Sequence, residues 1–284
     1  MSVGAPSTMY PRIRRTVGRW LGSWNRVGEQ TSFYAQTLRS IGDAVVHYKV
    51  EILRLIAQMS LGTGALALIG GTVVIVGFLT LSAGALVAVQ GYNLLAGVGV
   101  EALTGFISAY LNVRIIAPLN AGIGLAATIG AGATAQLGAM RISEEIDALE
   151  VMGIRSIAYL ASTRVIAGVL VVIPLYCVAV LMSFLAARVG TTLVYGQSTG
   201  VYDHYFHTFL NQTDLIWSFL MAVAMAVIVM VIHTYYGFTA TGGPAGVGEA
   251  VGRAVRASLI TVVFVTLVIS LSVYGQSGNF HLAG

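Results

Sequence analysis

Four acidic residues stand close together in the stretch AMRISEEIDALEVMGI, which covers residues 139–154. They fall within seven positions, although the whole chain of 284 residues has only 11 acidic residues. No Lys or Arg lies among them, and long apolar runs stand on both sides. Carboxylates gathered in this way can pair with basic groups of a binding partner. The four acids are Glu144, Glu145, Asp147 and Glu150.

The same stretch predicts a short helix. Ser143 is a good N-cap, the acids after it favour the positive end of the helix dipole, and Gly153 is a plausible stop. A helix of under three turns is marginal by itself, so neighbouring spans or a partner must hold it. The alternative is a solvated, capped turn, which leaves the apolar residues less well explained. Those residues are Ile142, Ile146 and Leu149 on one side, with Met152 close by, while Glu144, Asp147 and Glu150 lie on another.

Motifs for catalysis or nucleotide binding are absent from the sequence. There is no GxxxxGK[ST] phosphate loop, and the only lysine, Lys49, stands in HYKVE. Neither GxSxG nor HExxH occurs. His204 and His207 lack a clear third ligand, so we expect no metal site. The chain is predicted not to be an enzyme and to bind no cofactor; any ATP that drives it is hydrolysed by a partner subunit.

Composition indicates where these residues must sit. Hydrophobic residues make up 57% of the chain and charged residues 9%, against roughly 25% charged in soluble domains. Each uncharged stretch can supply the roughly 20 residues that cross a bilayer. The sequence predicts an all-α integral membrane protein with five transmembrane helices. Nothing beyond its net positive charge indicates binding to nucleic acid, so no nucleic-acid partner is expected. The spans are placed at 62–88, 115–139, 160–186, 215–237 and 257–275, from the uncharged stretches 55–100, 115–140, 165–187, 215–248 and 257–284.

Basic residues concentrate in alternate loops. By the positive-inside rule, residues 1–58, 141–164 and 249–256 are cytoplasmic, and 90–113 and 188–214 are external. This predicts a cell-membrane protein with a cytoplasmic N-terminus, an external C-terminus and a cytoplasmic acidic helix between spans 2 and 3. Residues 1–32 form a basic cytoplasmic segment and 33–59 an amphipathic interfacial helix, although such a helix can also pack on protein. Its apolar face is Tyr34, Leu38, Ile41, Val45, Tyr48, Ile52, Leu55 and Met59.

The second span carries small residues at every fourth position, which lets another helix approach closely. Packing within the chain is the simpler interpretation, and packing against a second subunit is the sharper one. Arg114, just before this span, is either functional or reaches to the external interface. His233 is either a proton relay or a hydrogen-bonded core residue. The small residues are Gly122, Ala126, Gly130, Thr134 and Gly138.

Several motifs resemble the MlaE/YrbE permeases, the membrane subunits of lipid-transporting ABC systems. They are GATAQLGAMRISEEIDALEVMGI, VQGY at 89–92, Arg114 with Pro118, and GGPAGVGEAVGRAV at 242–255. The chain is most similar to the second (B-type) YrbE permease of actinobacterial Mce systems, which makes 60–284 a five-span MlaE-type permease domain. The resemblance implies a homologous permease as heterodimer partner, a cytoplasmic ABC ATPase dimer, external MCE-domain proteins and a lipid substrate.

In this resemblance, 141–154 corresponds to the coupling helix that docks on the ATPase. Many relatives have charged residues where this chain has Ile115, Thr128 and Gln136, so those charges cannot be assigned roles here. Their loss favours a sterol over a fatty acid, because a fatty acid calls for a basic group and Arg114 is the only internal one expected. The predicted lipid path, or packing face, is Arg114, Asn120, Gly122, Ala126, Thr128, Gly130, Thr134 and Gln136.

Two other classes of function remain open. An ion-coupled secondary transporter could use Arg114 and His233, but it is disfavoured because no predicted span carries an acid. A membrane scaffold that transports nothing is compatible with the composition. Co-purification of an ATPase would favour the permease over both.

Overall fold

The computed structural model describes residues 27–61 and 66–275, and within these ranges the chain is helical with no strand. Of the predicted N-terminal basic segment, residues 1–26 lie outside the described residues. A helix over residues 27–39 comes first. The remaining α-helices are α2 (Ile41–His47), α3 (Lys49–Leu61), α4 (Leu66–Ala96), α5 (Thr104–Leu111), α6 (Ala117–Leu125), α7 (Ala131–Ile142), α8 (Glu145–Val151), α9 (Thr163–Val189), α10 (Thr199–Phe209), α11 (Gln212–Phe238) and α12 (Gly243–Tyr274).

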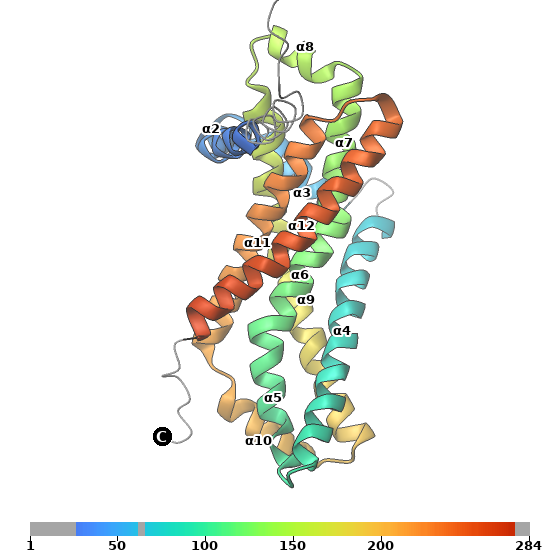
Figure 1. The fold of residues 1–284 in the computed structure, drawn as a ribbon, viewed down its shortest axis with the longest axis vertical. Coiled ribbons are helices and arrows are strands. Elements are labelled where there is room, and N and C mark those ends of the chain that lie inside the picture. Colours follow the sequence, from blue (N-terminus) through green and yellow to red (C-terminus); the bar gives the residue numbers. More distant parts are fainter. Residues whose placement is uncertain (1–26, 62–65, 276–284) are drawn as a thin grey trace, which may run out of the picture.

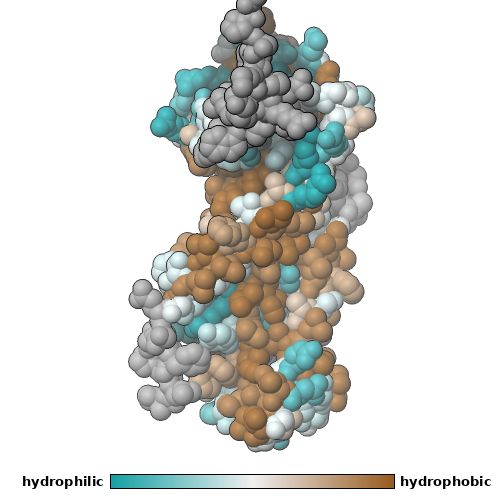
Figure 2. Space-filling view, in the orientation of Figure 1, coloured by the Kyte–Doolittle hydropathy of each residue, from teal (hydrophilic) through white to brown (hydrophobic). Residues whose placement is uncertain are grey.

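Five helical segments of the described chain are long and apolar enough to cross a membrane. They confirm the predicted all-α membrane protein with five spans. Hydrophobic side chains form a belt across the middle of the molecule, and hydrophilic ones gather near α8 (Figure 2). The segments are Gly71–Ala96, Glu101–Ile142, Ile157–Val194, Gln212–Phe238 and Gly243–Tyr274.

The predicted span boundaries are wrong at several ends. The second span was expected at 115–139, but its helix runs over Glu101–Ile142 and has 42 residues. At 1.5 Å per residue it is about 63 Å long, about twice the thickness of the hydrocarbon core. Its first part, α5, packs against α10, where a Cβ on Gly105 would lie 2.5 Å from the Tyr202 carbonyl oxygen. Residues 101–113, expected in an external loop, therefore continue the helix.

The two ends of the bundle differ in what they carry. Helices α2, α3 and α8 lie at one end, and α5 and α10 at the other (Figure 1). The segment predicted as one amphipathic helix over 33–59 is divided into the helix over 27–39, α2 and α3. Ile52 and Leu55 of α3 are buried, whereas Val50 and Leu53 are exposed. This helix therefore packs one face on the bundle and presents another apolar face outward.

π-Helical turns occur within the second span and at both ends of the third. The second contains η2 (Asn112–Ile116) and η3 (Ala126–Gly130), and the third begins with η4 (Ile157–Ser162) and ends with η5 (Gly190–Val194). Each such turn inserts a residue into the helix and changes the direction of the side chains after it. Four of the predicted path residues lie within these turns: Arg114, Ala126, Thr128 and Gly130.

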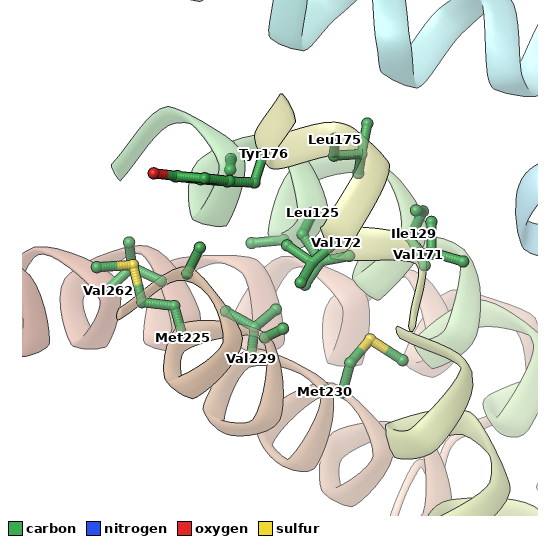
Figure 3. Close-up of a cluster of buried hydrophobic side chains, with 14 of the residues drawn as sticks. Leu125, Ile129, Val171, Val172, Leu175, Tyr176, Met225, Val229, Met230 and Val262 are labelled. Atoms are coloured by element: carbon green, nitrogen blue, oxygen red, sulfur yellow. The ribbon is translucent and has the colours of Figure 1, made fainter. Parts of the chain in front are cut away.

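The core is built from the second, third and fourth spans, with α12 closing one side. Leu125 and Ile129 lie beside the valines of α9, and Met225, Val229 and Met230 line the α11 side of the cluster (Figure 3). Val262 of α12 lies beside Met225 (Figure 3). In lipid this packing depends on close van der Waals contact, because burial from hydrocarbon gives little hydrophobic gain. Small residues are therefore needed where backbones approach.

The small-residue stripe of the second span packs within the chain. A Cβ on Gly122 would lie 3.0 Å from the Met225 sulfur, and one on Gly138 would lie 2.8 Å from Cγ1 of Val247. Ala126 and Thr134 have no exposed surface. The stripe thus contacts α11 and α12, which agrees with the simpler of its two interpretations.

Gly130 and Gly132 provide a matched test of this packing. A Cβ on Gly130 would lie 2.6 Å from Cδ2 of His233, whereas one on Gly132 meets nothing within 4 Å. We expect Gly130→Ala to lower the free energy of unfolding by about 1–3 kcal/mol through overpacking. Gly132→Ala should leave it unchanged or raise it by about 0.4–1 kcal/mol. Thermal unfolding of the detergent-solubilised protein measures both, and equal effects would contradict the assigned packing face.

Candidate functional site

The acidic stretch forms a helix, but it starts differently from the prediction. Ser143 is not its N-cap, because its hydroxyl oxygen lies 3.0 Å from the Ala139 carbonyl oxygen and 3.0 Å from a Glu145 carboxylate oxygen, and it donates its single proton to one or the other. Glu144 is the N-cap, in the left-handed conformation with φ 61°. Ser143 ends α7, and the chain turns sharply at Glu144 before α8 begins. Gly153 follows α8 with φ 77°, as expected of a stop.

The apolar residues of this segment divide into a buried and an exposed set. Ile146 is fully buried, and Leu149 packs on the same cluster as Leu137 and Leu160. Val151 and Met152 are 89% and 66% exposed. Val151 is the last residue of α8 and Met152 is its C-cap, and we call this exposed pair the α8 tip. Helix α8 lies at one end of the bundle (Figure 1). Sequence reasoning included Met152 but missed Val151. Of the other predicted apolar residues, Ile142 is 37% exposed at the end of α7.

Most of the acids are engaged by groups of the same chain. Asp147 forms a salt bridge with Arg141. Glu150 accepts a hydrogen bond from the Ser156 hydroxyl at 2.6 Å. A Glu145 carboxylate oxygen lies 3.0 Å from the Ser143 hydroxyl oxygen, and Glu144 is exposed. The acids therefore stabilise the turns before and after α8, and they also give this segment a negatively charged surface.

A salt bridge joins the α8 loop to the N-terminal helices. Arg155 Nη1 lies 2.6 Å from Asp43 Oδ2 of α2, and the two side chains are 74% and 43% exposed. Arg164 lies deeper, at 5% exposure, and donates to the Leu160 carbonyl at 2.9 Å. Arg114 is thus not the only internal base, contrary to expectation. Through the Arg155–Asp43 salt bridge, a displacement of α8 would move α2 as well as spans 2 and 3.

Arg114 lies near the α10 end of the bundle, where a carboxylate and two aromatic rings contact its positive charge. Its Nε and Nη2 donate to Asp214 Oδ2 at 3.0 and 2.7 Å. The guanidinium carbon lies 4.0 Å from the ring centroid of Tyr110 and 4.3 Å from that of Tyr274. Asp214 stands in the first turn of α11, and Glu101 begins the second span. The expectation that no span carries an acid is therefore wrong.

The remaining predicted path residues lie in two places. Thr128 and Gln136 line a small groove of about 70 Å³ together with Leu55, Met59 and Thr72. Thr128 also donates to the Gly124 carbonyl at 2.6 Å. Asn120 is half-buried in α6. In the described part of the chain, Thr128 and Gln136 therefore line one cavity and Arg114 lines another.

His233 is a hydrogen-bonded core residue. It has no exposed surface, and its Nδ1 and Nε2 lie 2.7 Å from Thr134 Oγ1 and 3.1 Å from Ser258 Oγ. The three residues join α7, α11 and α12. Polar groups paired across helices in this way satisfy each other in a dry environment. This geometry agrees with the simpler of the two interpretations of His233.

Helix α10 is fixed at the other end of the bundle. Tyr202 is buried, and its hydroxyl donates to Ser108 at 2.8 Å. Burial raises the pKa of Tyr202 to about 12, although this hydrogen bond acts in the opposite direction. Asp203 pairs with Arg188 at 2.6 Å. His204 and His207 are exposed, and the described residues contain no group of three potential ligands that could hold a metal ion.

Five apolar helices, a short helix with exposed apolar and acidic residues between the second and third, and a core of small residues describe a multi-pass membrane protein. The family described as Permease MlaE matches residues 62–272. The chain belongs to the MlaE permease family, and it is a transporter permease rather than an enzyme.

Curated relatives agree with this assignment. A probable ABC transporter permease protein of Rickettsia felis is 28% identical over 240 residues, which cover 84% of this chain and 92% of the relative. The chloroplast protein TRIGALACTOSYLDIACYLGLYCEROL 1 of Arabidopsis thaliana is 31% identical over 183 residues, 64% of this chain. That match spans 52% of the plant protein, so the chain corresponds to about half of its length.

Proposed function

We propose that this chain is the permease subunit of an ABC-type lipid importer of the Mce kind. In this proposal a cytoplasmic ATPase dimer hydrolyses ATP. The ATPase contacts α8, which transmits the conformational change of the ATPase to the membrane spans. The α8 tip is the observation that carries the proposal, because it exposes two large apolar side chains beside acidic groups. Interface hot spots commonly have this combination of a buried apolar anchor and a polar surround. A homologous permease and external MCE-domain proteins complete the complex.

An uncharged lipid is the favoured substrate, with a sterol preferred over a fatty acid. A fatty acid brings a carboxylate, which requires an available cation in a dry path. Arg114 pairs with Asp214 and is therefore not free for this role. Arg164, the other internal base, is 5% exposed and donates to the Leu160 carbonyl. The name of the Arabidopsis relative refers to a glycolipid, which supports lipid as the class of substrate. The secondary-transporter alternative is weaker, because both of its key residues, Arg114 and His233, already have partners.

Uptake measurements test the proposed function. Labelled cholesterol and labelled palmitate should be compared in a strain that lacks this chain and in the same strain complemented with it. We expect complementation to restore cholesterol uptake and co-purification of an ATPase with this chain. If palmitate alone is restored, the fatty-acid proposal replaces the sterol one. If neither lipid responds, lipid import is not the function.

Membrane orientation follows from the same proposal. The end of the helix bundle that carries α8 is assigned to the cytoplasm by the positive-inside rule, because it also carries Arg39, Arg54, Arg155 and Arg253. Reporters inserted at 152–156 or 239–242 are expected to read cytoplasmic. Reporters at 195–198 or after Gly284 should read external. A cytoplasmic signal after Gly284 would contradict five crossings.

A further inference from the structure

A cavity opens beside the Arg114–Asp214 ion pair. Its volume is about 280 Å³, and it lies between the start of α11 and the last turn of α12. Trp217 and Tyr274 give it aromatic walls, and Asn211 and Thr213 add polar groups. This volume lies just below the roughly 300–1,000 Å³ of typical ligand pockets. Four of the seven lining residues are polar or charged, so the cavity suits the polar end of a larger ligand.

The ion pair leaves this cavity without a free positive charge. The side chains of Arg114 and Asp214 are only 13% and 17% exposed, so water screens them weakly. Two rings, those of Tyr110 and Tyr274, lie within 4.3 Å of the guanidinium carbon. The guanidinium is therefore held by a carboxylate and by two aromatic rings. A second anion would have to displace Asp214 or accept a position beside it.

Charges around the cavity also disfavour an anion. At the α10 end, the described helices carry the bases Arg114 and Arg188 against the acids Glu101, Asp203 and Asp214. Two positive and three negative charges leave a net charge of −1. Arg188 is itself paired with Asp203. The field at this end therefore repels a carboxylate, whereas it leaves an uncharged ligand unaffected.

We propose that this cavity binds an uncharged lipid through its hydroxyl group, and that Asp214 excludes carboxylate-bearing lipids by holding Arg114. A hydroxyl both donates and accepts hydrogen bonds, so it can satisfy the amide of Asn211, the hydroxyl of Thr213 or the edge of the ion pair. The rings of Trp217 and Tyr274 suit an apolar ring system. This inference rests on the proposed function and assigns its charge selectivity to one residue.

Substitution of Asp214 tests the inference. Asp214→Asn keeps the shape of the side chain and removes its charge, which leaves the charge of Arg114 available to a carboxylate. In the complemented strain, the ratio of palmitate uptake to cholesterol uptake should rise about tenfold, or about 1.4 kcal/mol. Arg114→Gln combined with Asp214→Asn removes both charges, and the ratio should return toward that of the wild type. Glu249→Gln is the control, because it removes the acid of an exposed ion pair at the other end of α12, and it should leave the ratio unchanged.

The outcomes separate this inference from the proposed function. If the wild type restores uptake of a lipid but Asp214→Asn leaves the ratio unchanged, the role of Asp214 is overturned and the transporter function stands. If the wild type restores neither lipid, the proposed function fails and this inference fails with it. Immunoblots of the membrane fraction normalise the uptake to the amount of each variant.

A second measurement uses only the wild-type complex. A photoreactive cholesterol analogue should label the peptides that contain Trp217 or Tyr274 in native membranes. Unlabelled cholesterol should reduce the labelling, and palmitate at the same concentration should reduce it at least tenfold less effectively. Equal competition by palmitate, or labelling confined to other peptides, would overturn the proposal even if Asp214→Asn does not accumulate.

Discussion

Replacement of Val151 and Met152 together by aspartate is expected to abolish transport while the protein reaches the membrane normally. Both side chains are largely exposed, at 89% and 66%, so the change should cost little folding stability. In the assembled transporter they would face an apolar surface of the ATPase. Loss of hot-spot residues costs about 2–4 kcal/mol of binding. We therefore expect recovery of the ATPase with this chain to fall about 30- to 1,000-fold.

Co-purification from native membranes and lipid uptake measure this effect together. Glu249→Gln is a suitable control, because Glu249 is an exposed residue on α12 that pairs with Arg253 in the next turn, and glutamine removes its charge without placing two positive charges together. The change lies on another helix and should leave both measurements unchanged. Normal ATPase recovery with the double aspartate variant would show that the α8 tip is not the docking surface.

Reversal of the acids is a less selective experiment than the sequence suggests. From sequence alone, Glu144 and Asp147 present themselves as a pair that meets basic groups of the ATPase. In the structure Asp147 pairs with Arg141, so a lysine there would place two positive charges together. Its effect on transport would combine a damaged α8 with a damaged interface. Glu144→Lys, at the exposed N-cap, tests the acidic surface more cleanly.

The number of spans was predictable because hydrocarbon excludes unpaired charge. Each uncharged stretch had to be a helix that satisfies its own backbone, and five such helices are present. Their ends were not predictable by the same rule. Arg114 looked like the border of the second span, but Asp214 compensates it from a segment 100 residues away. No local pattern reveals a partner at that distance, although Asp214 directly precedes an uncharged stretch.

The candidate site was predictable in composition and not in detail. The spacing of acids and apolar residues correctly indicated a short helix between spans 2 and 3. It did not reveal which of Ser143 and Glu144 adopts the turn, because that depends on how α7 ends. Nor did it separate Ile146, which is buried, from Val151, which is exposed. Such distinctions depend on the surrounding bundle, which binary patterning does not encode.

Gly84→Ala is expected to be among the most destabilising single changes in the chain, because its added atom meets backbone. A Cβ on Gly84 would lie 2.3 Å from the carbonyl oxygen of Ser183 in α9. Side chains can rotate away from such contacts, but a carbonyl inside a helix moves only with the whole helix. We expect the free energy of unfolding to fall by about 3 kcal/mol, at the upper end of overpacking costs. Gly77 lies two turns earlier on α4, and its Cβ would meet Met182 at an ordinary 3.8 Å. Gly77→Ala should therefore be tolerated, and equal thermal stability of the two variants in detergent would show that α4 and α9 are further apart than this packing requires.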